Sequence, residues 1–91
     1  VPKWADPCWH LFVIRTPNRD AYQSKLTDNG IGTLIHYPIP PHLQGAYEFL
    51  HYSKGSFSIA EKMAMEVLSI PMGIHLDEGI LEKSIFDQRL A

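Results

Sequence analysis

The chain has 91 residues, the length of one domain. A domain of this size buries only about 60–65% of the surface that its unfolded chain exposes, so it lies near the lower limit of independent stability. A net charge of −2 and scattered Lys and Arg residues give no electrostatic basis for binding nucleic acid. No apolar run approaches the about 20 residues that cross a membrane. The single cysteine, Cys8, cannot form an internal disulfide, which favours a cytoplasmic protein.

The first half of the chain predicts two strands separated by a helix. Residues 1–7 are typical of a linker. Residues 9–15 are almost continuously apolar, which predicts a strand covered on both faces. A helix is then expected from Thr16-Pro17 to about residue 29, because a capping hydroxyl precedes a proline. Gly30 stands where a left-handed helix cap is usual.

Residues 31–37 predict the second strand, which the prolines that follow would end abruptly. Alternation places Leu34 and His36 on one face, and Ile31, Thr33, Ile35 and Tyr37 on the other.

The second half predicts a short helix over residues 42–50 and a helix that begins at Ser58. Ser58 and Glu61 match the capping box. Residues 68–72 predict a short strand whose proline favours an edge or a strand end, and a last helix is expected from Asp77. The order is β-α-β-α-α-β-α. We therefore predict one α+β domain over residues 1–91, a two-layer arrangement with helices packed on a small sheet.

The five histidines suggest a metal site, but their spacing does not support one. No pair is four apart on a helix, and no second cysteine or acidic cluster accompanies them. We expect no structural metal. The histidines are His10, His36, His42, His51 and His75.

The sequence shows no autonomous active site. Nothing near Cys8 lowers its pKa in an identifiable way. The serines of residues 53–58 are explained by turns and caps. The glycines at positions 30 and 32 belong to a helix end running into a strand, not to a phosphate-binding loop.

One segment is a candidate binding site. Residues 36–42, HYPIPPH, place two imidazoles and a phenol at a strand end on a proline-stiffened loop. His36, Tyr37 and His42 could hydrogen-bond to phosphate or to sugar hydroxyls. The alternative interpretation is that the prolines merely terminate the strand and that Tyr37 packs.

Read with its flanks, this segment resembles the C-terminal region of the DegT/StrS sugar aminotransferases, and most closely the branch that acts on dTDP-linked keto sugars. The similarity covers essentially the whole chain in the correct order. Its most specific part is residues 35–44. The segments that carry it are residues 9–15 (WHLFVIR), 18–20 (NRD), 29–33 (NGIGT), 35–44 (IHYPIPPHLQ) and 67–71 (VLSIP).

The resemblance implies the small C-terminal domain of a fold-type-I aminotransferase. Such enzymes hold pyridoxal 5'-phosphate in a large domain and are homodimers with active sites at the subunit interface. They transfer an amino group, usually from glutamate, to a nucleotide-linked keto sugar. Their products feed lipopolysaccharide O-antigen, S-layer glycan or antibiotic deoxyamino sugars in bacteria.

The same resemblance assigns the Schiff-base lysine to the large domain. We therefore expect no catalytic residue in this chain and no cofactor bound by it alone. It implies that His36 and Tyr37 face the substrate or cofactor cleft, with His42 as a further candidate.

The alternative hypothesis is a stand-alone α+β binding or interaction module, since one fold serves many functions. The two hypotheses differ in the surface they predict. A domain separated from its parent should expose apolar area, for which Trp4, Trp9, Met63, Met65 and Met72 are the candidates. A monomer whose melting temperature shifts with ligand would instead favour the module.

Overall fold

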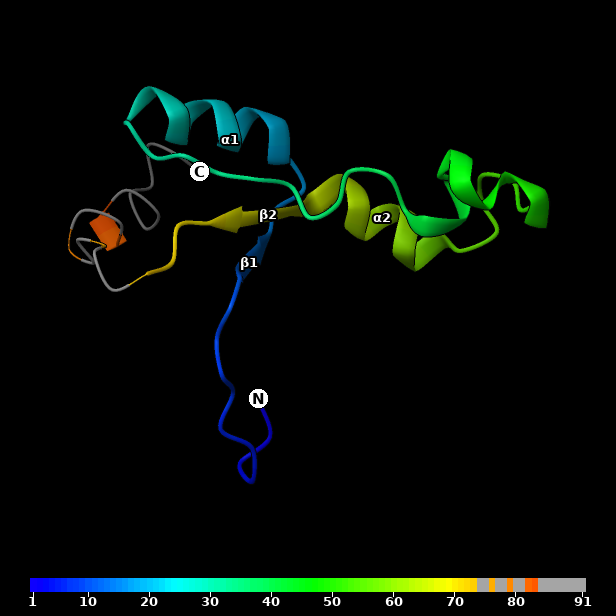
Figure 1. Cartoon of the computed structure of the whole chain (residues 1–91). Coiled ribbons are helices and arrows are strands. Elements are labelled where there is room, and N and C mark those ends of the chain that lie inside the picture. Colours follow the sequence, from blue (N-terminus) through cyan, green and yellow to red (C-terminus); the bar gives the residue numbers. More distant parts are fainter. Residues whose placement is uncertain (74–75, 77–78, 80–81, 84–91) are drawn as a thin grey trace.

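The computed structural model describes residues 1–73, 76, 79, 82 and 83. Its elements are β1 (Phe12–Arg15), α1 (Arg19–Asp28), the 3₁₀ turns η1 (Pro41–Leu43) and η2 (Gly45–Leu50), α2 (Ser58–Glu66) and β2 (Val67–Ile70). Figure 1 shows α1 lying along the sheet, while α2 and the turns beside it extend away to one side. The predicted α+β class is confirmed. None of the described helices is long and apolar enough to span a bilayer.

The sheet has β2 at its centre. β1 and β2 are antiparallel, with Phe12 opposite Ile70 and Arg15 opposite Val67. On the other side of β2, Leu34 forms a single bridge with Ser69. All four residues of β2 are buried. Pro71 follows the last residue of β2, so the prediction that this proline marks an edge or a strand end is confirmed at the strand end.

A small apolar core lies between α1 and one face of the sheet. It consists of Leu26 from α1, Leu68 and Ile70 from β2, and Ile31 from the segment that follows α1. Ile14, Tyr22 and Ile35 pack against it and are partly buried. Leu26 and Leu68 have no exposed surface. The predicted alternation is therefore right for Ile31 and Ile35, which face the core, and for Leu34, which is 64% exposed. It is wrong for Tyr37, which was predicted on the face of Ile31 but is exposed outside the core.

The end of α1 explains how Ile31 enters this core. Gly30 has a φ of 79°, and its N–H donates to the Thr27 carbonyl at 2.9 Å. The Ile31 N–H donates to the Leu26 carbonyl at 2.9 Å. These two bonds define a Schellman cap, in which a hydrophobic contact joins the residues on either side of the helix end. Here that contact is the one between Leu26 and Ile31. The predicted cap at Gly30 is confirmed.

The two predicted N-terminal strands are shorter than expected. The first is β1 alone, and Phe12 and Val13 are 45% and 46% exposed, so coverage on both faces is wrong for the described residues. Residues 31–37 form no strand beyond the bridge at Leu34. Gly30 and Gly32 at one end and Pro38 at the other leave too few residues for a continuous ladder.

The predicted helices differ from the observed ones at their starts. α1 begins at Arg19 with Asn18 as its N-cap, and the Tyr22 N–H donates to the Asn18 carbonyl at 3.0 Å, so Thr16 is not the cap. The expected helix over residues 42–50 consists instead of η1 and η2, because Gln44 between them is extended.

In α2 only one half of the predicted capping box forms. The N-cap is Phe57 and no side chain caps the helix, so the expected role of Ser58 is wrong. The Glu61 carboxylate does reach back, and it accepts the Phe57 N–H at 3.1 Å. The last predicted helix, from Asp77, lies outside the described residues apart from isolated positions.

Candidate functional site

The bridge between Leu34 and Ser69 positions the candidate site. The Leu34 N–H donates to the Ser69 carbonyl at 3.1 Å, and the Ser69 N–H donates to the Leu34 carbonyl at 2.7 Å. Leu68 and Ile70 face the core, so alternation places Ser69 on the opposite face of the sheet. Val13 lies opposite Ser69 in β1 and shares that face. We call this side, marked by Val13, Leu34 and Ser69, the open face.

His36 follows Leu34 by two residues and lies against Ser69. Its Nδ1 is 2.8 Å from the Ser69 hydroxyl oxygen, in a partly buried contact. The ring of Tyr37 meets the His36 ring edge-on, with centroids 5.2 Å apart. Tyr37 itself is 68% exposed. His36 and Tyr37, predicted from the sequence, are therefore brought together at one end of the open face.

A pocket of about 450 Å³ lies at the same place. Its walls are mainly apolar, with a few polar groups that converge, as is usual for small-molecule sites. The Thr33 hydroxyl oxygen is buried there without a hydrogen-bond partner among the described residues. The residues that line the pocket include His10, Leu11, Thr33, His36, Ser69 and Met72.

His42, the third predicted residue, is not brought to this pocket. Its side chain is only 6% exposed, and its Nε2 lies 3.2 Å from a Glu61 oxygen. The contact does not meet the geometry of a hydrogen bond, and no other partner of this nitrogen is found among the described residues. Phe57 meets the His42 ring edge-on at 4.9 Å. His42 also borders a second hollow, of about 410 Å³, with Glu48, His51 and Tyr52. His42 thus joins η1 to the start of α2 through Phe57 and Glu61.

Glu61 is the acceptor at the centre of that packing. The backbone N–H of Gly55 donates to its carboxylate at 2.8 and 3.0 Å, and that of Phe57 does so at 3.1 Å. These donors, Gly55 foremost, hold the pKa of Glu61 below its usual value, and His42 adds to the effect while burial opposes it.

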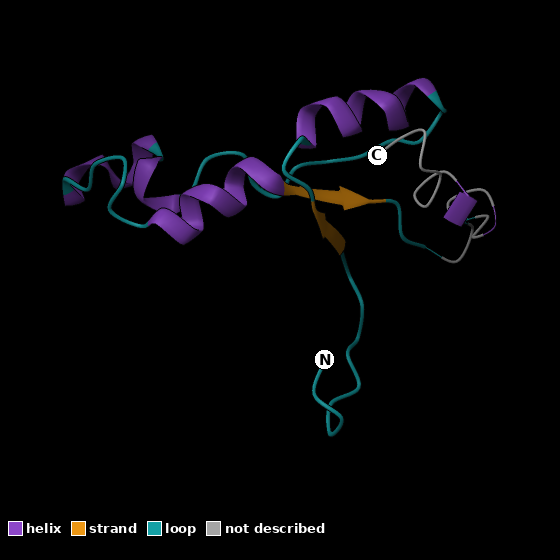
Figure 2. Cartoon of the chain, turned by 180° about the vertical axis from the view of Figure 1, so that it is seen from behind, coloured by secondary structure: helices purple, strands orange, loops and turns teal. Residues whose placement is uncertain are grey.

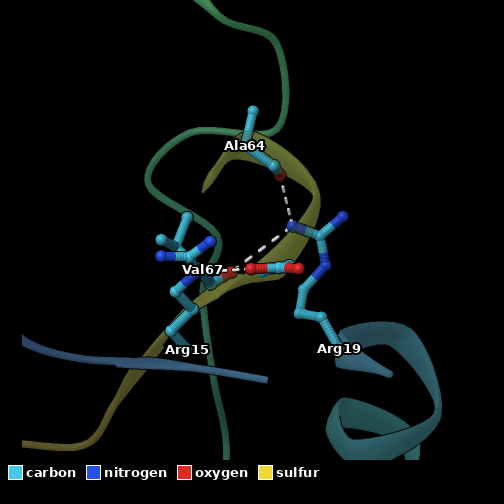
Figure 3. Close-up of polar contacts among 5 residues, drawn as sticks. Arg15, Arg19, Ala64 and Val67 are labelled. Atoms are coloured by element: carbon cyan, nitrogen blue, oxygen red, sulfur yellow. Dashed lines mark hydrogen bonds and ion pairs between the residues drawn. The ribbon is translucent and has the colours of Figure 1, made fainter. Parts of the chain in front are cut away.

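Two arginines join the first half of the chain to α2 and β2 (Figure 3). The Arg19 guanidinium donates to the carbonyls of Ala64 at 2.6 Å and Val67 at 3.3 Å, and its Nε pairs with Asp20 at 2.8 Å. Arg15 forms an ion pair with Glu66. Because α2 runs directly into β2, the carbonyls at the helix end need an outside donor. Arg19 supplies it, so its role is to hold the scaffold.

Ser69 and Thr33 were not predicted as site residues from the sequence. Ser69 lies 33 positions from His36 and falls within an apolar strand. His10 was noted only among the dispersed histidines. The lysines do not contribute an amine to the pocket: those of the described residues are all exposed and none lines it, namely Lys3, Lys25, Lys54, Lys62 and Lys83. Within the described part of the chain, no three potential metal ligands gather.

Fold and site together define a small α+β domain with a pocket beside Ser69 and His36. We compared the chain with known protein families and structures. Residues 1–85 match the model of the DegT/DnrJ/EryC1/StrS aminotransferase family. The chain belongs to this family.

Relatives and solved structures agree with the assignment. The chain is 59% identical over 73 residues to the erythromycin biosynthesis sensory transduction protein EryC1 of Saccharopolyspora erythraea, covering 80% of this chain and 20% of that one. It is 50% identical over 72 residues to dTDP-3-amino-3,4,6-trideoxy-alpha-D-glucose transaminase of Streptomyces venezuelae, covering 79% and 19%.

Among solved structures, S. venezuelae DesV in complex with a ketimine intermediate superposes with a TM-score of 0.82 at 42% identity, covering 90% of this chain and 23% of that one. A family aminotransferase from Brucella abortus gives a TM-score of 0.68 at 36% identity, over 82% and 20%. The chain spans about a fifth of the length of the curated relatives it matches.

Proposed function

We propose that this chain is the small C-terminal domain of an aminotransferase that uses pyridoxal 5'-phosphate to place an amino group on a nucleotide-linked keto sugar. The observation that carries the proposal is the match along residues 1–85 to a family whose similar members include named nucleotide-sugar transaminases. In this proposal residues 1–91 form one domain, with residues 1–7 as the linker to a larger cofactor domain.

The large exposed surface of the chain supports the proposal that a further domain covers part of it. The chain exposes 7314 Å², whereas a folded chain of its mass exposes about 5,400 Å². The difference, roughly 1,900 Å², exceeds the area of a typical interface between domains of one chain. The open face contributes to it through Val13 and Leu34, and the N-terminal segment through Trp9, which is 57% exposed. We propose that the large domain covers these residues.

Within the enzyme, we propose that the pocket beside Ser69 contacts the substrate. His36 lines it with its Nδ1 beside the Ser69 hydroxyl, and the exposed Tyr37 ring lies against the His36 ring. Thr33 also lines the pocket, and its buried hydroxyl oxygen has no hydrogen-bond partner among the described residues. For His42, whose side chain is buried against Glu61, we propose a positioning role on the loop that carries Tyr37.

Pyridoxal 5'-phosphate, when bound, supplies the electron sink that transamination requires. The pocket described above lacks an amine that could hold it. The lysine and the phosphate-binding groups would therefore come from the large domain. This chain would then contribute substrate contacts, cover over the reacting groups and exclusion of water.

Finer features of the proposal follow from the family. We propose glutamate as amino donor, a dTDP-linked sugar as acceptor and a homodimer as the working form. The reaction would take place in the bacterial cytoplasm and serve deoxyamino sugar or O-antigen synthesis. The dTDP sugars named in two of the relatives support this choice of nucleotide.

The first experiment is the visible absorbance of the full-length protein, purified with pyridoxal 5'-phosphate and then mixed with glutamate. A bound chromophore whose band shifts with glutamate, and shifts back with 2-oxoglutarate, is the expected result. Full-length protein without bound chromophore would contradict the proposal and favour a stand-alone binding module. Free alanine, added to the protein instead of free glutamate, is the control for the choice of amino donor.

A further inference from the structure

Ser69 is buried, and its hydroxyl has one evident partner. It is 5% exposed, both of its backbone groups are engaged with Leu34, and its side-chain oxygen lies 2.8 Å from Nδ1 of His36. In the part of the chain that the structure describes, no other hydrogen bond to this oxygen is found. Its neighbours Leu68 and Ile70 pack in the core. The position of the Ser69 hydroxyl relative to His36 is therefore set by the packing of β2.

Two arrangements of hydrogen fit this contact. In the first, the Ser69 O–H donates to Nδ1 and the neutral ring carries its hydrogen on Nε2. In the second, Nδ1–H donates to the Ser69 oxygen, and the serine hydrogen then needs another acceptor. Leaving a buried donor without a partner is costly. The first arrangement is therefore preferred. A protonated ring would donate from Nδ1 and still carry a hydrogen on Nε2.

We infer that Ser69 is a positioning residue that holds the His36 ring so that Nε2–H is a hydrogen-bond donor to the substrate. The inference rests on the proposed function and names the chemistry of that same site. The partner of Nε2–H is an acceptor oxygen of the nucleotide-linked sugar. It lies either on the diphosphate or on the sugar. Because Ser69 lies between two core residues of β2, it holds the donor in place before binding, which lowers the ordering entropy lost on binding.

The test uses the full-length enzyme with dTDP-3-amino-3,4,6-trideoxy-alpha-D-glucose, the compound named in one relative, and 2-oxoglutarate as amino acceptor. Ser69→Ala is expected to raise KM for the amino sugar about threefold to tenfold, the effect of losing one hydrogen bond. KM for 2-oxoglutarate should not change. Ser69→Thr keeps the hydroxyl and is expected to restore KM to within about twofold of wild type.

Two His36 variants show whether Ser69 acts through His36. The amide nitrogen of glutamine reaches near the position of Nε2, so His36→Gln should retain more affinity than His36→Ala. In the His36→Ala background, adding Ser69→Ala should cause no further rise in KM, because residues that act as a unit are not additive.

Thymidine diphosphate as an inhibitor distinguishes the two sources of the acceptor oxygen. Weaker inhibition of Ser69→Ala points to the diphosphate, and unchanged inhibition with a raised KM points to the sugar. Either result supports the positioning role.

Three results would overturn the inference: an additive effect of Ser69→Ala in the His36→Ala background, a loss in Ser69→Thr as large as in Ser69→Ala, or no change of KM in any variant. Failure of the proposed function can be distinguished from failure of this inference. In that case the absorbance of the wild-type enzyme would not respond to glutamate.

Discussion

Buried polar side chains join the separate segments of this small protein. In the described part of the chain, Arg19, His42 and Ser69 are the polar or charged residues classed as buried. Arg19 connects α1 to the end of α2, His42 connects the turn after the prolines to Glu61, and Ser69 connects β2 to His36. Since burial of a polar group is costly unless it is paired, each pairing also specifies which segments lie together.

Thr33, which is only partly buried, has a buried hydroxyl oxygen with no hydrogen-bond partner among the described residues. We expect Thr33→Val in the full-length protein to leave the free energy of unfolding unchanged or to raise it by up to about 1 kcal/mol, because an unpaired buried hydroxyl is removed. If the substrate supplies the partner, KM for the sugar should rise severalfold.

The measurements for Thr33→Val are thermal unfolding and steady-state kinetics. Thr27→Val is the matched control, because the Thr27 hydroxyl already donates to the Gln23 carbonyl at 3.0 Å on an exposed helix face. A Thr33→Val protein that is clearly less stable and has an unchanged KM would show that the hydroxyl is paired within the full-length fold.

Glu61 gives stability a dependence on pH. Its pKa is held below 4.5 in the folded state, chiefly by the Gly55 N–H. A pKa that is lower in the folded state stabilises the fold at pH values above the pKa of the unfolded state. This stabilisation is lost as the pH falls through the pKa of the folded state. We expect Glu61→Gln to lower the melting temperature at pH 7. As the pH falls below about 4.5, the melting temperature of Glu61→Gln should fall less than that of wild type.

Thermal melts of the full-length protein between pH 7 and pH 3 test this expectation. Glu48→Gln is the comparison, because Glu48 is an exposed carboxylate of η2 to which no hydrogen bond is found within the described residues. Parallel pH profiles for wild type and Glu61→Gln would contradict the assigned role.

At the scale of elements, two helix ends determine how the layers meet. The Schellman cap of α1 turns the chain back so that Ile31 packs on Leu26. The end of α2 has no loop after it, and β2 begins at the next residue. Thr16 supports this junction by donating its N–H to the Glu66 carbonyl at 2.9 Å.

Gly30 is expected to be sensitive to substitution because of its backbone angle. A side chain there meets nothing within 4 Å, but φ is +79°. Gly30→Ala should therefore cost about 1–2 kcal/mol of unfolding free energy, the price of a left-handed residue with a Cβ. Gly45→Ala, also in open space and without a positive φ, should cost less than about 0.5 kcal/mol. Thermal unfolding of the two variants compares them, and equal losses would argue against the cap.

Substitutions of Arg19 and Arg15 should lower the free energy of unfolding by different amounts, because the two side chains are 10% and 50% exposed. Thermal unfolding measures both. Arg19→Met leaves the Ala64 and Val67 carbonyls without their donor and should cost about 1–3 kcal/mol. Arg15→Met removes a half-exposed ion pair with Glu66 and should cost at most about 1 kcal/mol. The reverse order of melting temperatures would show that the Arg19 contacts contribute little.

At the scale of the whole molecule, the chain is extended and apolar at its surface. Its radius of gyration is 15.8 Å, compared with about 12 Å for a compact domain of this length. In both Figure 1 and Figure 2 the N-terminal segment runs away from the sheet, and α2 with the 3₁₀ turns leads away from the core. The residues expected to be exposed are so: Trp4 is 87% exposed and Met65 68%.

We therefore expect the 91-residue chain by itself to remain expanded or to self-associate. Small-angle scattering should give a radius of gyration of about 16 Å or more, and a dilution series in sedimentation velocity should show association. The full-length protein should lack the dye binding that exposed apolar area gives the isolated chain. A compact monomer with a radius near 12 Å would contradict this expectation.

Short-range features of this protein were predictable from its sequence. The cap at Gly30, the strand end at Pro71, the α+β class and the sides taken by Leu34 and Ile35 all depend on a few adjacent residues, whose backbone preferences and alternation act locally. His36 and Tyr37 remain predicted site residues, chosen because they stand at the end of an expected strand on a proline-stiffened loop and match the family resemblance.

Tertiary structure alone decided the features that depend on residues distant in sequence. The single bridge of Leu34 to β2, the reach of Arg19 to the end of α2 and the burial of His42 against Glu61 have no local signal. Ser69 joined the site for the same reason: it is 33 residues from His36. Which polar groups become buried partners depends on how the segments pack, because only packing removes the water that would otherwise satisfy them.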